Sequence, residues 1–527
     1  MHTAEHSPNG CYTIIGLSKD IVFIFEVHQP YRLKAEAYVE LLRLALKGKL
    51  SNDVLEKVLI DHGLNKHIFE RVANRCYRVA TKILLETCER LAEAEHNAKF
   101  SFSISGILLE QLLENAPDLI ELLRKGVEKD FFELIGQTYY HSLSSLLPDT
   151  EEFEKQVEAH RALMNEVFGS KPIVAENTEM IYNNDIAKIF GDLGFKAIIT
   201  EGVDWVLHGR SPNYLYTSLD RSIKVLLRNY RLSDDVGFRF SMRTWDQYPL
   251  TADKYAEWLR ATPGEVIVIA MDYETFGEHH PPETGILEFL RYLPIEITKR
   301  GMALESPSRV IDSHRPIDIY DVPPWNTISW ADERDLSAWL GNEMQQRAFK
   351  LYMELEPYVK ATGDPYLRFW RLLGTSDHFY YMAMKTGSTG EVHTYFSPYK
   401  SPFRAFEIYM EALLTLMNTV IDEISSKPRY YVNKIVLPKN KAFHFYIAPG
   451  VYTGKYARSL GELLKAIEEL PAESMIYHIK RGDLQNWLRT YFLLEEVVAE
   501  LNELMNSIVD QNVFKQRVIE ALRKTLC

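Results

Sequence analysis

Acidic side chains and histidines follow a short apolar run in the middle of the chain. The run covers residues 266–271 and is rich in β-branched residues, which is typical of a buried parallel strand. Directly after it come Asp272, Glu274, Glu278 and His279. Enzymes built on parallel strands carry their reactive side chains at the C-terminal ends of those strands. The segment therefore predicts a catalytic edge with carboxyl groups that can donate a proton or attack as nucleophiles.

Three earlier apolar runs end in the same way, which strengthens the prediction of a shared edge. Cleavage of a glycosidic bond requires two carboxyl groups that face one pocket, one carrying a proton and one ionised. Position alone does not select the pair from the acids at these strand ends. The runs and the polar residues after them are 21–27 with His28 and Gln29, 131–137 with Tyr140 and His141, and 172–175 with Glu176 and Glu179.

The elements that must position these groups alternate between strands and helices from residue 20 to about residue 310. Such alternation predicts an α/β fold with a parallel sheet, and seven or eight strands would close a barrel. Further strands are expected at residues 100–105, 196–200 and 224–227, and helical periodicity dominates from about 336 to 424. We therefore expect a leader at 1–19, a catalytic barrel at 20–310, a helical domain at 311–426 that contributes to the mouth of the active site, and a small α-rich C-terminal domain at 427–527.

Composition narrows the class of partner. The chain has 527 residues and a formal net charge of −13, which argues against binding to nucleic acid or to an anionic membrane surface. A neutral substrate is the natural expectation. The four cysteines form no CxxC pair, and the first apolar stretch is far shorter than a membrane span, so we expect a cytoplasmic protein without a membrane segment. No pattern in the sequence sets an oligomeric state.

Several motifs together resemble the signature regions of glycoside hydrolase family 57, in family order. Each motif alone is weak, but five in order make a specific signal. Patterns at residues 228–235 and 375–382 are similar to those of the α-amylase-like branch of the family. The five regions are residues 27–30 (VHQP), 136–141 (GQTYYH), 177–184 (NTEMIYNN), 271–279 (MDYETFGEH) and 330–342 (WADERDLSAWLGN).

The resemblance implies a retaining mechanism on an incomplete seven-stranded (β/α) barrel that is followed by a helical region. Glu179 matches the family's nucleophile and Asp272 its general acid/base, and the implied substrate is an α-1,4-glucan or a maltooligosaccharide. No cofactor is implied. Many family members begin the first region with His-x-His, whereas this chain has Glu26 at the first of these positions. We therefore assign no sugar contact to position 26.

Other polar and aromatic residues in these motifs are expected to bind substrate. The histidines among them could instead bind a metal ion or have a structural role. We expect them to form hydrogen bonds with sugar hydroxyls, and we expect no metal site. Tyr140 and Trp330 could stack on glucose rings, although ordinary burial explains them equally well. The expected substrate-binding residues are His28, Gln29, Tyr140, His141, Glu274, His279, Trp330, Asp377 and His378.

Three alternatives to a retaining glycoside hydrolase stay open. A 4-α-glucanotransferase would use the same glycosyl-enzyme and pass it to a sugar instead of water. A metal-dependent barrel hydrolase or a catalytically silent glucan-binding protein would belong to other classes.

Residues 443–504 resemble a small domain of unknown function that is appended to carbohydrate-active enzymes. In that domain His478, Arg481, Asp483 and Trp487 could line a ligand groove, and a domain interface is the simpler use.

Overall fold

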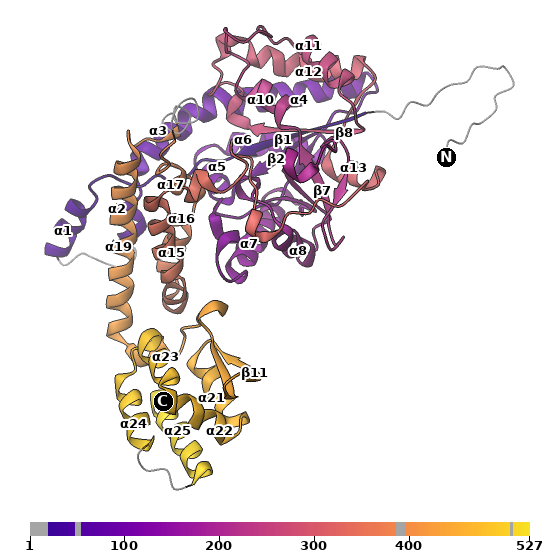
Figure 1. The fold of residues 1–527 in the computed structure, drawn as a ribbon. Helices are drawn as coiled ribbons and strands as arrows, with labels where there is room; N and C mark the ends of the chain where they lie inside the picture. Colours follow the sequence, from indigo (N-terminus) through magenta and orange to yellow (C-terminus); the bar gives the residue numbers. More distant parts are fainter. Residues whose placement is uncertain (1–18, 48–53, 386–395, 506–509, 527) are drawn as a thin grey trace. The chain divides into compact units, whose positions relative to one another are not determined.

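Seven parallel strands form the central sheet of the first half of the chain (Figure 1). In the computed structural model, residues 19–47, 54–385, 396–505 and 510–526 are described. All seven strands coincide with apolar runs in the sequence, so the prediction of an α/β fold with a parallel sheet is confirmed. The strands, in the order β3-β2-β1-β8-β7-β5-β4, are Phe132–Leu134, Phe100–Ile104, Asp20–Val27, Val266–Asp272, Lys224–Arg228, Ala197–Glu201 and Val174–Glu176.

The two outer strands of this path are joined only by a single bridge. Gly136, just after β3, donates its backbone N–H to the carbonyl of Val174 over 2.9 Å and accepts from the N–H of Glu176 over 2.8 Å. A Cβ atom at position 136 would lie 2.6 Å from the Phe195 ring, so this close approach requires glycine. The result is the expected incomplete (β/α)7 barrel. Two short strands extend the sheet, β6 (Tyr216–Thr217) beside β7 and β9 (Ala303–Leu304) beside β1.

Side chains alternate between the inside and the outside of the barrel along each strand. In β1, Val22 and Ile24 belong to the inner core, while Phe23 and Phe25 pack against the surrounding helices. In β8, residues 266, 268 and 270 belong to the inner core and residues 267, 269 and 271 to the outer layer. Because side chains on a strand alternate with period two, the next position of each strand, residue 26 or 272, also faces the barrel interior.

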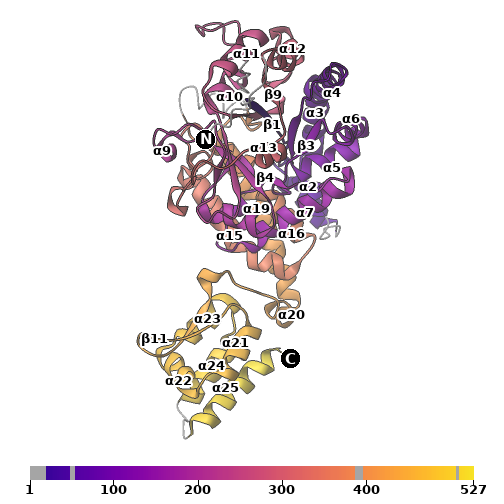
Figure 2. The ribbon, with the colours of Figure 1, turned by 90° about the vertical axis from the view of Figure 1, so that its right-hand side faces the viewer.

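Helices cover the outside of the barrel (Figure 2). Their apolar faces pack on the outward side chains of the strands and form one continuous core, which buries both faces of the sheet as parallel sheets require. The helices of this part of the chain are α3 (His62–Val72), α4 (Arg78–Glu93), α5 (Gly106–Asn115), α6 (Pro117–Glu128), α7 (Glu151–Phe168), α8 (Asn184–Asp192), α9 (Asp204–Leu207), α10 (Tyr230–Gly237), α11 (Ala252–Ala261), α12 (Ile286–Lys299), α13 (Pro307–Ser313) and α14 (Ser337–Leu340), with the π-helix η1 (Ala73–Tyr77) and the 3-10 turns η3 (Thr178–Met180), η4 (Tyr273–Thr275), η5 (Pro282–Thr284) and η6 (Pro324–Asn326).

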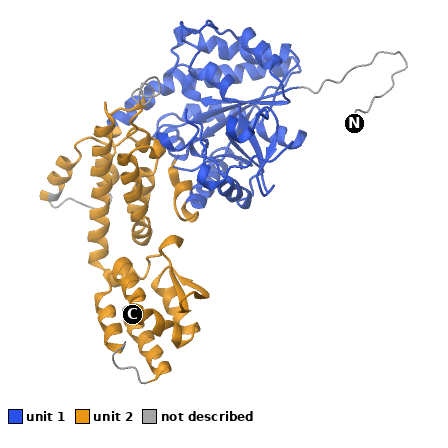
Figure 3. Cartoon of the chain, in the orientation of Figure 1, with its two compact units in different colours: residues 1–30, 63–141, 153–338 blue, residues 31–62, 142–152, 339–527 orange. Residues whose placement is uncertain are grey.

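The chain divides into two compact units, drawn in blue and orange in Figure 3. The first comprises residues 1–30, 63–141 and 153–338 and holds the barrel. The second comprises residues 31–62, 142–152 and 339–527 and is mainly helical. Its elements are α1 (Tyr38–Leu46), α2 (Val54–Leu59), η2 (Leu143–Leu146), α15 (Glu343–Thr362), α16 (Tyr366–Leu373), α17 (Ser376–Tyr380), α19 (Pro402–Ser426), α20 (Pro428–Val432), η7 (Lys439–Lys441), β10 (Phe443–Ala448), β11 (Val451–Ala457), α21 (Leu460–Glu469), α22 (Ala472–Arg481), α23 (Asp483–Phe492), α24 (Glu495–Met505) and α25 (Gln511–Leu526).

The C-terminal part of the second unit has a core of its own. Helices α21 to α25 pack around the inner face of the β10–β11 hairpin, with buried Phe445, Leu463 and Leu488 among them. This agrees with the expected helical region and small α-rich C-terminal region. The predicted leader lies outside the described residues except for Lys19. None of the described helices has the length and apolar character that crossing a membrane requires.

Candidate active site

Polar side chains occupy the last inward-facing positions of the strands, at the C-terminal mouth of the barrel. In the register of β1 and β8, Glu26 pairs with Asp272, and paired positions of neighbouring strands face the same side of a sheet. Below this rim the interior is apolar. The rim therefore gathers several carboxyl groups above the apolar interior of the barrel. The residues at these rim positions are Glu26 of β1, Ser103 of β2, Glu176 of β4, Glu201 of β5, Arg228 of β7 and Asp272 of β8.

Glu179 follows β4 in a strained backbone conformation. Its φ of 58° and ψ of 23° lie in the left-handed region, which costs free energy for a residue with a side chain. A short antiparallel ladder holds this loop, because Tyr182 and Ile328 exchange two backbone hydrogen bonds of 3.0 Å and Trp330 N–H donates to the Glu179 carbonyl over 3.2 Å. The same Trp330 donates its indole Nε1–H to Oε2 of Glu179 over 2.8 Å. The backbone hydrogen bonds thus fix the backbone of the predicted nucleophile, and the indole of Trp330 fixes its carboxylate.

A buried ionic network supports the segment that carries Trp330. The Arg334 guanidinium donates to the carbonyl oxygens of Trp330 and of Ala331, the latter over 3.0 Å, and lies 3.3 Å from Oε2 of Glu201. Arg228 donates to Glu201 over 2.8 Å and to Asp234 over 2.6 Å. Its carboxylate partners raise the pKa of Arg228, although burial opposes them. These paired charges link β5, β7 and α10 to the loop beneath Glu179.

His141 lies between two acids of the rim. Its Nε2 is 3.7 Å from Oε1 of Glu179, and its Nδ1 is 3.6 Å from Oε1 of Glu26 and 2.9 Å from Oε1 of Gln137. The ring stacks on that of His28 with a centroid distance of 4.1 Å. His141 therefore connects Glu26, the register partner of Asp272, with Glu179.

Glu26 and Glu176 form a buried pair of acids within this rim. Burial, followed by the neighbouring charge of Glu176, raises the pKa of Glu26 well above its ordinary value. Burial also raises the pKa of Glu176 to about 7. Two carboxyl groups in one buried site resist double ionisation, so the pair retains a proton at neutral pH. Gln137 donates to Oε1 of Glu26 over 3.0 Å and fixes that side chain.

Glu274 is a further buried acid, two residues after Asp272. It accepts hydrogen bonds from the hydroxyl of Tyr77 and from Nε2 of Gln29, the latter over 3.2 Å. Burial raises the pKa of Glu274 to about 7, against the effect of these two donors. Tyr77 ends the π-helix η1, an irregularity often found at functional sites.

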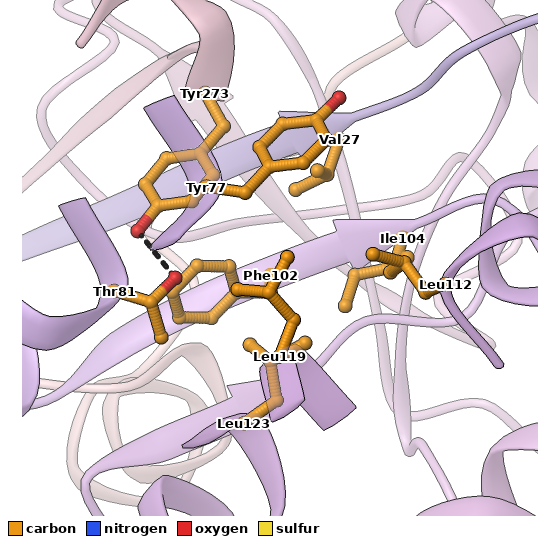
Figure 4. Close-up of a pocket in the computed structure, with 9 residues that line it drawn as sticks. All are labelled: Val27, Tyr77, Thr81, Phe102, Ile104, Leu112, Leu119, Leu123 and Tyr273. Carbon is orange, nitrogen blue, oxygen red and sulfur yellow. Dashed lines mark hydrogen bonds between the residues drawn. The ribbon is translucent and has the colours of Figure 1, made fainter. Parts of the chain in front are cut away.

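The cavity behind this acid is an internal packing gap. It has a volume of about 10 Å³, about one water probe, and is lined almost entirely by apolar side chains between β1, β2 and the surrounding helices. Figure 4 shows Tyr77 and Tyr273 beside it, with the Tyr273 hydroxyl hydrogen-bonded to Thr81 over 3.0 Å. This gap is too small for a sugar ring.

The remaining predicted residues lie in three places. Tyr140 is buried beside the Tyr139 ring at 4.9 Å. His279 follows η4, and burial lowers its pKa to about 3, so its ring is neutral. Asp377 and His378 lie on α17 in the second unit, where Asp377 accepts from the Tyr381 hydroxyl over 3.3 Å. Their contact with substrate stays a prediction.

Sequence reasoning missed several residues that shape the site. Glu26 received no role, yet it meets Gln137 and Glu176 at the rim. Tyr77 and Arg334 were also missed, because their partners Glu274 and Glu201 are distant in sequence and no spacing reveals these contacts. Across the described ranges, no group of three or more His, Cys, Asp or Glu side chains is arranged to hold a metal ion.

Comparisons with known proteins identify the family of the chain and relatives of its fold. The model of the family described as glycosyl hydrolase family 57 matches residues 22–323. A protein of Methanocaldococcus jannaschii described as "Putative alpha-amylase" is 48% identical over 404 residues, which are 75% of this chain and 83% of that protein. Two solved structures share the fold at low identity. A branching enzyme from Pyrococcus horikoshii has a TM-score of 0.53 at 15% identity, covering 77% of this chain and 94% of its own, and the 4-alpha-glucanotransferase of Thermococcus litoralis has a TM-score of 0.50 at 18% identity, covering 69% and 56%. This chain belongs to glycosyl hydrolase family 57.

Proposed function

We propose that this protein is a retaining enzyme that cleaves α-1,4 bonds between glucose units, with Glu179 as nucleophile and Asp272 as general acid/base. The observation that carries the proposal is the orientation of the Glu179 carboxylate by Trp330, on the same barrel mouth that Asp272 faces. The relatives described as alpha-amylases and as a 4-alpha-glucanotransferase support the choice of α-glucans as substrate. The buried free thiols of Cys76 and Cys88 fit the reducing cytoplasm, where we place the protein.

In the first step, the Glu179 carboxylate attacks the anomeric carbon while Asp272 protonates the glycosidic oxygen. The bond from carbon to that oxygen breaks, the sugar on the reducing-end side departs, and a glycosyl ester forms on Glu179. In the second step, Asp272 takes a proton from water, and the resulting attack on the anomeric carbon releases Glu179. Two inversions retain the α configuration. This scheme requires carboxyl groups about 5–5.5 Å apart.

Glu179→Gln and Asp272→Asn test the assignment. Each variant should lower the turnover of maltoheptaose by at least about 10³-fold, because each removes a group that acts on the reacting bond. Glu283→Gln serves as a matched control, because Glu283 is an exposed acid with no part in the predicted site. Unchanged turnover in both variants would overturn the assignment. A wild-type protein that binds maltoheptaose without cleaving it would indicate a glucan-binding protein instead.

The acceptor of the second step decides between a hydrolase and a 4-α-glucanotransferase. Both outcomes use the same glycosyl ester, and they differ in whether water or a sugar hydroxyl attacks it. With maltotriose as substrate, a hydrolase yields only shorter sugars. A transferase also yields maltooligosaccharides longer than maltotriose. Chromatography of the products at early times separates the two.

A further inference from the structure

The β10–β11 hairpin exposes aromatic rings on one face. Tyr452 and Tyr456 are 44% and 48% exposed. In the antiparallel register they lie opposite Tyr446 and His444, so the four rings share the outward side of the hairpin. The inward side chains Phe443 and Phe445 are buried in the C-terminal core. We call the four outward rings, of residues 444, 446, 452 and 456, the aromatic face.

A pocket of about 310 Å³ lies between the aromatic face and helix α22. This volume reaches the lower end of the ~300–1,000 Å³ that small-molecule sites occupy. All of the lining residues lie between positions 442 and 483, so the pocket belongs to the C-terminal part of the second unit. Its lining includes His444, Tyr446, Tyr477, His478, Arg481 and Asp483.

The polar side of the pocket is fixed by a chain of hydrogen bonds. The backbone N–H of Tyr446 donates to Nε2 of His478 over 2.8 Å, so the ring proton is on Nδ1, which donates to Oδ2 of Asp483 over 3.1 Å. Because Nε2 accepts a hydrogen bond, the ring is neutral in this arrangement, and burial lowers the pKa of His478 in the same sense. Arg481 donates through Nε to the same Asp483 oxygen over 2.9 Å. The imidazole thereby anchors the hairpin to α22.

The charge balance of the pocket favours a neutral ligand. Arg481 and Asp483 compensate each other, and His478 carries no charge, so an anion gains little there. The guanidinium still has free donors and the carboxylate free acceptor positions, which suit pairs of sugar hydroxyls. The aromatic rings offer flat apolar faces for the C–H side of a sugar ring. These are the features of a site for a neutral, polyhydroxylated chain.

We propose that this pocket and the aromatic face form a second, non-catalytic binding site for an α-glucan chain. The choice of an α-glucan over other neutral sugars rests on the proposed function of the barrel. Such a site would hold a long or insoluble substrate on the protein and would raise its local concentration.

Binding of the full chain to granular starch tests this proposal. Tyr446→Ala and Arg481→Gln should each lower the affinity for the granules by about tenfold, because each removes a central contact. The affinity is obtained from the fraction of protein that sediments with the granules. Tyr430→Ala is the matched control, since Tyr430 is an exposed tyrosine of the same unit outside the pocket and its loss should leave binding unchanged. Arg481 is exposed at the end of α22, so its substitution keeps the fold even if Tyr446→Ala does not.

Equal sedimentation of wild type and folded Arg481→Gln would overturn the proposal, as would a wild-type protein that does not bind granules. Wild-type turnover of maltoheptaose is measured in parallel and tests the proposed function separately. A protein that binds granules through the pocket but cleaves no glucan would retain this site and refute the catalytic assignment. Stronger binding to cellulose than to starch would refute the choice of an α-linked chain.

Discussion

Trp330 donates its indole N–H to Oε2 of Glu179 over 2.8 Å, and its backbone N–H donates to the Glu179 carbonyl. One residue therefore holds both ends of the predicted nucleophile. The hydrogen bond leaves Oε1, which faces His141 at 3.7 Å, on the other side of the carboxylate. Sequence alone left stacking on sugar and ordinary burial both open for Trp330, and stacking stays a prediction. The two contacts with Glu179 add a second role, because they predict a positioning effect on catalysis.

Replacement of Trp330 by Phe should reduce kcat/KM on maltoheptaose by roughly 10- to 100-fold. Phenylalanine keeps a flat aromatic ring, although a smaller one, but the carboxylate loses a charged hydrogen bond worth about 1.5–3 kcal/mol. Steady-state kinetics check this. Trp325→Phe provides the control, because Trp325 is 82% exposed in the same unit. Equal kinetics for the Trp330 variant and this control would show that the indole N–H does not matter.

Arg334→Lys should lower kcat about tenfold while the melting temperature changes little. Arg334 reaches both carbonyls and Glu201 through Nη1 and faces Asp234 through Nη2, whereas lysine keeps the charge but has a single nitrogen for all of these partners. Arg231→Lys is a suitable comparison, since Arg231 makes an exposed ion pair with Asp204. A large loss of stability without a change in kcat would assign Arg334 to folding alone.

The buried Glu274 predicts a pH dependence of stability. Its pKa rises from the ordinary 4.5 to about 7 in the folded protein, so folded chains bind more protons than unfolded ones between these values. Stability from this group is therefore complete below pH ~4.5 and declines as the pH rises through ~7, by about 1.4 kcal/mol per pKa unit. Glu274→Gln should remove this decline.

Thermal unfolding at pH 5 and pH 7.5 checks the Glu274 prediction. The difference in melting temperature between Glu274→Gln and wild type should shift in favour of the variant as the pH rises. The exposed Glu283 offers a control substitution to Gln that leaves the pH profile unchanged. A constant difference between the Glu274 variant and wild type at both pH values would contradict the role of this acid.

The acid role of Asp272 predicts a dependence on the leaving group. Asp272→Asn should lose at least about 10³-fold on maltoheptaose, but much less in the first step on a 2,4-dinitrophenyl α-maltooligoside, whose phenolate leaves without a proton. Glu179→Gln should lose activity on both substrates, because no ester forms. Burst kinetics of phenolate release measure the first step. Equal losses of Asp272→Asn on both substrates would argue against the acid role.

The fold was predictable because its strands are short, β-branched and separated by helices. The inward and outward sides of β1 and β8 follow directly from the alternation of their residues. The closing bridge at Gly136 was not predictable, because it depends on the close approach of Phe195. Segments 31–62 and 142–152 lie between barrel segments in the sequence but belong to the second unit, and no local composition reveals this.

The site was predictable only in part, for a related reason. Motifs placed His28, His141 and Glu179 at strand ends, and the structure brings these three together. The contacts of Tyr77 with Glu274 and of Arg334 with Glu201 span long stretches of sequence, and they depend on how η1 and the loop after Trp330 pack. Residue type and spacing identify groups that can react, whereas the groups that hold them become visible only in three dimensions.

The anomeric configuration of the first product tests the central claim most directly. Proton NMR of maltoheptaose hydrolysis, recorded before mutarotation, should show the α-anomer at the new reducing end. This result requires two displacements through an ester such as the one proposed on Glu179. Initial formation of the β-anomer would mean a single displacement by water and would contradict Glu179 as a nucleophile.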